Sequence, residues 1–194
     1  MRNPKTSREE LVAAATQLLA EESISHFSIG RVCARAGVSR RSFFNYFKDK
    51  DDLLTEVLGT LRESHMQAMQ QWSADLPPEL GVEERIRLIF TRILTIIQMP
   101  DWRGSAFIRL SGELSTVEGH PIHEVVAQTK RDQEKWFEEE LVRGKFTSPS
   151  ELATQLTIIM TGLFQLQLVH RAPYLGEAVL SLIPRLLASS RLNQ

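Results

Sequence analysis

A short segment of the chain, residues 27–54 (FSIGRVCARAGVSRRSFFNYFKDKDDLL), carries side chains suited to contacts with a nucleic acid. Arg40 and Arg41 follow directly on the sequence Ala-Gly-Val-Ser at residues 36–39, and Asn45 comes one helical turn after Arg41. In the major groove of DNA, arginine pairs with guanine and asparagine with adenine through two hydrogen bonds each. Such side chains read bases only when one short helix presents them together, so the flanking sequence must supply that helix.

The flanking residues predict two short helices joined by a tight turn. Ser28 is placed to cap a helix over residues 29–36, and Gly37 to end that helix in the left-handed conformation that glycine adopts without strain. Ser39 is placed to cap a second helix over Arg40–Tyr46. A helix-turn-helix needs a turn of about three or four residues, usually with a glycine. The pattern therefore favours a DNA-binding head.

The second helix of such a motif offers side chains from its first turn to base edges. Here that turn holds Arg40, Arg41 and Ser42. The charge distribution agrees, because residues 1–50 contain nine lysines and arginines against five acidic residues, whereas the whole chain has a net charge of -1. On these grounds alone, a helical hairpin with solvated arginines and a chance clustering of charge remain alternatives.

Apolar residues recur at helical spacing along the rest of the chain, without strand alternation or an internal repeat. About nine helices are expected, over residues 7–22, 29–36, 40–46, 49–72, 83–99, 102–118, 121–143, 149–172 and 175–192. Pro184 lies inside the last of these and predicts a kink or a restart. The expected fold is all-α, with a three-helix head over residues 1–55 and a helical bundle over residues 56–194, bridged by the fourth helix.

Composition argues for a soluble cytoplasmic protein. The hydrophobic content of 42% suits a globular core, and no apolar run approaches the roughly 20 residues that span a bilayer. The polar N-terminus lacks the apolar core of a signal peptide. The single cysteine, Cys33, fits a reducing compartment and is expected to be buried as a small apolar residue. No contact with a membrane is expected.

Enzyme motifs are absent from the sequence. His120, His123 and Glu124 invite a metal interpretation, but they lack a third well-placed ligand, and His120 before Pro121 is better explained as a helix-entry residue. No phosphate-binding glycine loop, nucleophile elbow or dinucleotide fingerprint is present. The sequence therefore predicts neither catalysis nor a metal or cofactor.

The segment as a whole resembles the DNA-binding domain of the tetracycline repressor (TetR) family. The family pattern runs Thr/Ser-x-x-x-Ile-Ala-x-x-Ala-Gly-Val-Ser, then an aromatic pair, then Phe-x-x-Lys-(Glu/Asp)-x-Leu. The matching positions are Ser28, Val32, Cys33, Ala36, Gly37, Val38, Ser39, Phe43, Phe44, Phe47, Lys50, Asp51 and Leu53. The resemblance covers about residues 7–55 and implies a regulator that binds a palindromic double-stranded operator as a homodimer.

The resemblance also implies roles for single residues. Lys50 would meet a DNA phosphate together with the amides at the start of the fourth helix, and Tyr46 would do so through its hydroxyl. Ser28 and Ser39 could donate to the DNA backbone besides capping their helices. The family commonly has tyrosine where this chain has Phe44, so a phosphate contact is missing there and Phe44 is expected in the core.

The C-terminal half resembles the family more weakly. The resemblance implies that the helices near residues 149–172 and 175–192 pair with a second copy, and that a small-molecule effector between the middle helices releases the operator. The candidate pocket residues, each otherwise a core residue, are Phe90, Leu94, Trp102, Phe107, Glu113, His123, Trp136 and Phe164. Glu113 and His123 would be the polar anchors. A helical protein–protein adaptor with a vestigial DNA-binding head is the alternative function.

Overall fold

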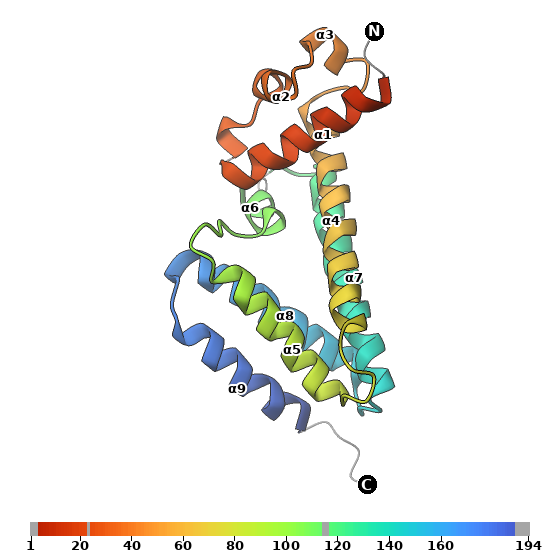
Figure 1. Ribbon diagram of the computed structural model, residues 1–194, viewed down its shortest axis with the longest axis vertical. Coiled ribbons are helices and arrows are strands. Elements are labelled where there is room, and N and C mark those ends of the chain that lie inside the picture. The colour runs from red at the N-terminus through yellow and green to blue at the C-terminus, as the bar shows by residue number, and fades with distance from the viewer. Residues whose placement is uncertain (1–3, 23, 114–116, 189–194) are drawn as a thin grey trace. The chain divides into compact units, whose positions relative to one another are not determined.

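The computed structural model describes residues 4–22, 24–113 and 117–188, and within these ranges it contains helices and no strand (Figure 1). The predicted all-α class is confirmed. The helices of this part of the chain are α1 (Pro4–Glu21), α2 (Ile29–Ala36), α3 (Arg40–Phe43), α4 (Lys50–Ala74), α5 (Val82–Ile97), α6 (Ala106–Glu113), α7 (Pro121–Arg143), α8 (Pro149–His170) and α9 (Tyr174–Ala188), with a 3₁₀ turn, η1, over Ile24–His26.

The chain forms two compact units, and α4 and α7 each pass from one into the other. The head unit comprises Met1–Glu63 and Ser105–Ala127, and the body unit comprises Ser64–Gly104 and Gln128–Gln194. The sequence predicts a boundary at residue 55 and leaves residues 105–127 with the body. The structure instead groups that segment with the head unit, because Leu110 and Ile122 are buried in the core of the head.

One apolar core holds the head unit together, and every helix of the unit contributes to it. Its buried members are Leu11, Ala14, Ala15, Leu18, Leu19, Phe27, Val32, Cys33, Val38, Phe43, Phe47, Leu53, Leu54, Val57, Leu58, Leu110 and Ile122. The members from α1 recur at helical spacing and form a single buried stripe. Burial raises the pKa of the Cys33 thiol, and the charge of Arg40 offsets only part of that shift. Cys33 is therefore a small apolar core residue, as predicted.

A polar contact also attaches α6 to the head. The guanidinium of Arg109 donates hydrogen bonds to the carbonyls of Leu19 and Glu22, with 3.1 Å between Nη1 and the Glu22 oxygen. These carbonyls lie at the C-terminal end of α1, where backbone acceptors lack helical partners and the helix dipole favours a positive charge. Arg109 therefore satisfies the end of a helix that is distant in sequence.

In the body unit, α5, α8 and α9 lie side by side (Figure 1). α8 has 22 residues, and its most apolar 18-residue window has a mean hydropathy of 1.4. By length and composition alone this helix could cross a membrane, although polar residues interrupt its apolar sequence. Leu152, Leu156 and Leu163 of α8 are buried in the body core, which also accounts for much of its apolar character.

Several helices end differently from the sequence prediction. The third helix ends at Phe43 instead of Tyr46, because the N–H groups of Asn45 and Tyr46 donate to carbonyls three positions back and form a tighter turn. The sixth begins at Ala106 instead of Trp102, and Gly104 before it has a φ of 91°; residues 114–116, in the predicted span, lie outside the described residues. α9 runs through Pro184 to Ala188 without the expected restart, and residues 189–194 lie outside the described residues.

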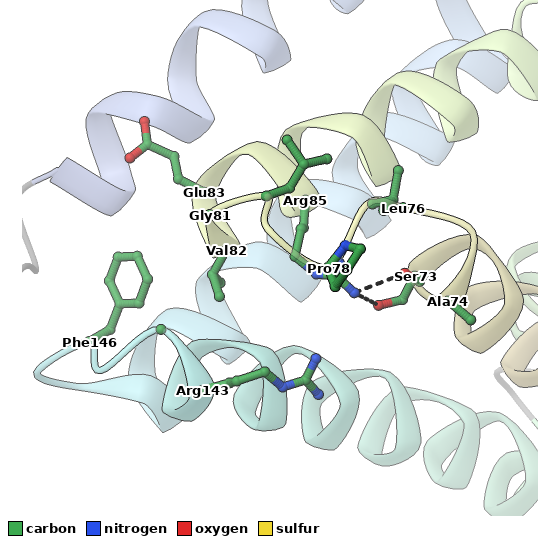
Figure 2. Close-up of a pocket in the computed structure, with 12 residues that line it drawn as sticks. Ser73, Ala74, Leu76, Pro78, Gly81, Val82, Glu83, Arg85, Arg143 and Phe146 are labelled. Carbon is green, nitrogen blue, oxygen red and sulfur yellow. Dashed lines mark hydrogen bonds between the residues drawn. The ribbon is translucent and has the colours of Figure 1, made fainter.

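A buried carboxylate joins three segments at one end of the body unit. Glu140 of α7 is 3% exposed and accepts hydrogen bonds from Ser73 Oγ at 2.9 Å, Arg85 Nε at 3.4 Å and Arg143 Nη1 at 3.2 Å. Figure 2 shows Arg85 also donating to Ser73, whose backbone carbonyl lies 2.8 Å from Arg85 Nη2. This network satisfies the end of α4 and connects it to α5 and α7.

Replacing Gly37 tests the turn between α2 and α3. Gly37→Ala is expected to lower the free energy of unfolding by about 1 kcal/mol, because a side chain is strained at the φ of 62° found there. Gly30→Ala is the matched control, since a Cβ at Gly30 meets no atom within 4 Å and alanine favours helix. Urea unfolding followed by circular dichroism should show opposite signs for the two variants, and a shared sign would contradict this account.

Glu140→Gln tests the carboxylate network. The variant is expected to lose about 3 kcal/mol of unfolding free energy, because the guanidinium of the largely buried Arg85 loses its charged partner. Glu139→Gln is the control, since Glu139 is exposed and lies 3.9 Å from Lys135 in a surface pair worth less than about 1 kcal/mol. Chemical unfolding of both variants measures the difference. Equal losses would show that Glu140 has no special role in stability.

Candidate nucleic-acid interface

Gly37 sets the direction of the chain between α2 and α3. It has φ 62° and ψ 31°, in the left-handed region, and its N–H points back to the carbonyl of Ala34. The N–H of Val38 then donates to the carbonyl of Cys33 at 3.0 Å, and the Val38 side chain is buried in the head core. The predicted turn, with its glycine and its apolar wedge, is confirmed.

The predicted caps are also present on both helices of the motif. The Ser28 side chain accepts from the N–H of Arg31 at 3.4 Å at the start of α2. The Ser39 side chain accepts from the N–H of Ser42 at 3.0 Å at the start of α3. The hydroxyls of Ser39 and Ser42 lie 2.9 Å apart. The two short helices therefore begin where the sequence predicts.

α3 and the turn after it expose three side chains that can recognise bases. Arg40, Arg41 and Asn45 are all exposed. Neither arginine forms an ion pair with a carboxylate in the part of the chain that the structure describes. Two guanidinium groups are thus available to hydrogen-bond acceptors outside the protein, and Asn45 adds an amide within the same short stretch.

The arginines of α2 differ from those of α3. Arg31 forms a two-pronged ion pair with Glu22, with its closest contact at 2.5 Å, and Arg35 lies 2.7 Å from Glu21. Glu21 and Glu22, at the C-terminal end of α1, therefore neutralise the two arginines of α2. This pairing leaves the charges of the α3 arginines without a partner carboxylate, in contrast to those of α2.

The two aromatic residues beside α3 differ from the sequence expectation. Phe44 is 55% exposed, so the prediction that it belongs to the core is wrong. Phe43 occupies the core position instead and is fully buried, because the helical turn directs neighbouring side chains to different sides. Tyr46 is half-buried and packs against the head core, so its phosphate contact stays a prediction.

The start of α4 is already capped by the protein itself. Asp49 Oδ1 accepts from the backbone N–H groups of Asp51 at 3.0 Å and of Asp52 at 2.9 Å, and Asp52 Oδ2 accepts from the N–H of Lys48 at 2.9 Å. These amides are therefore engaged, which weakens the expectation that they would join Lys50 around a phosphate. Lys50 itself is half-buried, and its contact with a phosphate stays a prediction.

A contact between α7 and α4 was not foreseen from the sequence. His120, 9% exposed, accepts the N–H of Ile122 at its Nδ1 at 3.2 Å, which makes it the entry residue of α7 as predicted. Its Nε2 lies 3.4 Å from Asp51 Oδ2, one residue after Lys50. With Nδ1 accepting from Ile122, the N–H of a neutral His120 ring lies at Nε2, on the side of Asp51. No spacing rule relates these two residues, so only the fold reveals the pair.

The eight candidate pocket residues are divided between the two units. Phe90, Leu94 and Trp136 are buried in the body core, and the rings of Trp102 and Phe164 lie 6.2 Å apart at its edge. The remaining three belong to the head unit and are Phe107, Glu113 and His123. Glu113 is exposed, and His123 Nε2 contacts the carbonyl of Val117 at 3.0 Å. Glu113, at the last residue of α6, is therefore no buried polar anchor.

A cleft of about 630 Å³ lies at another place, where the α4–α5 connection meets the end of α7 (Figure 2). Its lining residues are Ser73, Ala74, Leu76, Pro78, Leu80, Gly81, Val82, Glu83, Arg85, Arg143, Gly144 and Phe146. None of the eight pocket residues predicted from the sequence is among them. The two arginines that line this cleft, Arg85 and Arg143, both donate hydrogen bonds to Glu140. Their side chains therefore belong to the stabilising network described above.

A second group of buried polar side chains lies in the body between α4, α7 and α8. Burial lowers the pKa of His65, and the charge of Lys130 lowers it further. Burial also lowers the pKa of Lys130, whose Nζ donates to Thr161 Oγ1 at 2.9 Å. Gln133 Nε2 and Thr157 Oγ1 are buried without a hydrogen-bond partner among the described residues. Buried polar atoms of this kind are costly unless another group satisfies them.

Comparison with known proteins identifies the head. Residues 11–57 match the family described as "Bacterial regulatory proteins, tetR family". The chain is 31% identical over 72 residues to the HTH-type transcriptional regulator AcrR of Shigella flexneri, covering 37% of this chain and 33% of that protein. It is 20% identical over 97 residues to the fatty acid metabolism regulator protein of Bacillus subtilis, covering 50% and 48%. These matches span about half the length of the curated relatives or less.

Solved structures extend the similarity to the whole chain. A putative TetR transcriptional regulator from Streptomyces avermitilis superposes with a TM-score of 0.81 and 28% identity over 97% of this chain and 98% of the other. Escherichia coli NemR in its reduced form gives a TM-score of 0.84 at 19% identity over 96% and 99%, a likeness of fold alone. With the turn, the caps and the α3 arginines in place, the head of this chain carries the DNA-binding domain of the TetR family of bacterial regulatory proteins.

Proposed function

We propose that this chain is a sequence-specific DNA-binding transcriptional regulator whose α3 enters the major groove. The observation that carries the proposal is the exposure of Arg40, Arg41 and Asn45 on one short stretch, with both guanidiniums unpaired among the described residues. Arginine and asparagine there match the donor and acceptor patterns of guanine and adenine. Ser28, Ser39, Ser42, Tyr46 and Lys50 complete the proposed DNA-contacting set, chiefly through phosphates.

The proposed regulator acts as a homodimer through α8 and α9. These two helices expose large apolar side chains, namely Ile158 at 64%, Leu166 at 43%, Val169 at 65% and Leu182 at 45%. A surface of this kind indicates a contact with another protein surface, and a second copy of the same helices is self-complementary under two-fold symmetry. A dimer would present two α3 helices to two half-sites of a palindrome.

The proposed output is repression, relieved by a small-molecule effector in the body unit. The pocket residues predicted from the sequence that share this unit are Phe90, Leu94, Trp102, Trp136 and Phe164. The unsatisfied Gln133 and Thr157 supply polar groups that a ligand would pair with. α4 and α7 each have residues in both units. A shift of either helix on effector binding would therefore be transmitted to the DNA-binding head. The proposed location of the regulator is the cytoplasm, where operator DNA is.

The adaptor hypothesis predicts a different response to DNA. An adaptor with a vestigial head would bind duplexes weakly and without regard to sequence. Arg40 and Arg41, exposed and without a carboxylate partner among the described residues, favour the regulator. Two such guanidinium groups on one turn are suited to DNA contacts that an adaptor would not make.

Substitutions on α3 and α4 separate base reading from phosphate binding. Arg41→Ala is expected to relax the choice of base at one position of the site, at a cost of about 1–3 kcal/mol for the preferred base. Lys50→Ala is expected to weaken all sites alike and to reduce the dependence of affinity on salt. Mobility shifts with the DNA flanking the gene measure both. Arg35→Ala is the control, since Arg35 is engaged by Glu21. Unchanged binding by both test variants would refute these assignments.

A charge on the exposed face of α8 tests the dimer. Val169→Glu is expected to convert the protein to monomers and to weaken operator binding at least tenfold, because two linked heads no longer engage the palindrome together. Val142→Glu is the matched control, since Val142 is 58% exposed but lies on α7. Sedimentation equilibrium gives the molecular mass of each variant. A dimer that survives Val169→Glu and dissociates with Val142→Glu would place the interface elsewhere.

A further inference from the structure

Phe44 is an exposed phenyl ring at the end of α3. It is 55% exposed, and among the described residues of the head unit the only other large apolar side chain with comparable exposure is Val117, at 43%. Single exposed apolar residues are common on protein surfaces. The position of this one is unusual, because it directly follows α3 and adjoins the exposed Asn45.

The ring of Phe44 is held in place by the core beneath it. Its edge meets the fully buried ring of Phe43, with centroids 5.2 Å apart and planes at 86°. Phe43 in turn packs against Phe47 at 5.5 Å. The backbone of Phe44 is fixed as well, since it forms the cap of α3 with φ -68° and ψ -6° and its N–H turned toward the Arg40 carbonyl. The ring therefore rests against the core on one side and leaves more than half of its surface exposed.

The surroundings of Phe44 fit a nucleic acid better than a protein partner. A protein–protein contact is expected to have a contiguous apolar centre that is depleted of charge. Phe44 instead lies in the same short stretch as the exposed, unpaired Arg40 and Arg41. In the major groove, the apolar feature of the base edges is the C5-methyl group of thymine, and phenylalanine is among the side chains that contact it.

We propose that Phe44 is a specificity-determining residue that reads a thymine in each half-site through contact of its ring with the C5-methyl group. The inference rests on the proposed DNA-binding function. The expected operator carries a thymine at a fixed place beside the bases read by the arginines.

Replacing thymine by deoxyuridine removes only the methyl group and tests this contact directly. A bound operator is first located by footprinting on the DNA flanking the gene, and each thymine is then replaced in turn, symmetrically in both half-sites. With the natural chain, one symmetric pair of positions is expected to weaken binding about fourfold per half-site, the effect of one buried methyl group. With Phe44→Ala, the same replacement should have no effect. Phe44→Leu, which keeps an apolar side chain, should retain part of the sensitivity.

The controls separate this inference from the proposed function. Val117→Ala removes the other exposed apolar residue of the head unit and should leave the methyl sensitivity unchanged. Circular dichroism melting shows whether Phe44→Ala and Phe44→Leu are folded. If deoxyuridine affects the natural chain and both Phe44 variants equally at every position, Phe44 does not read thymine and the inference fails while DNA binding stands. If the natural chain binds no duplex sequence-specifically, the proposed function and the inference both fail.

Discussion

The left-handed turn at Gly37 is the constraint on which the rest of the interface depends. The φ of 62° lets α2 end, buries Val38 against the head core and brings Ser39 to the position where its side chain caps α3. A different turn would change the direction in which α3 leaves the core. Because α3 is only four residues long, it has little stability of its own and depends on this turn and on the burial of Phe43.

Charge pairing then decides which basic residues of the head face outward without a partner. Glu21 and Glu22 bind the arginines of α2, while those of α3 meet no carboxylate in the described part of the chain. The segment 105–127 strengthens the same unit through Arg109 at the end of α1 and His120 beside Asp51 at the start of α4. The head is thus larger than its motif, and its far segment continues through α7 into the body.

Much of the head could be predicted from the sequence because its signals are local. Serine caps, the glycine and the helical spacing of apolar residues each act within a few positions, so the turn and both caps are where they were expected. The burial of Phe44 was predicted wrongly because the chain leaves the α-helical conformation in the tight turn over residues 44–46. In such a turn, the spacing of residues in the sequence no longer indicates which side chains point into the core. The roles of Arg109, Asp51 and Glu140 depend on partners between 55 and 90 positions away, and no local pattern specifies them.

The central claim, that α3 and its turn read base sequence while cations hold the DNA backbone, is tested most directly by operator affinity as a function of salt. Binding to the operator and to a scrambled duplex of the same composition should be measured in parallel. If each head of a dimer neutralises at least two phosphates, log K should fall with log salt at a slope of about -4 or steeper on the operator, with a clear preference for it over the scrambled duplex. Equal affinity for both duplexes, or affinity that is insensitive to salt, would contradict the account.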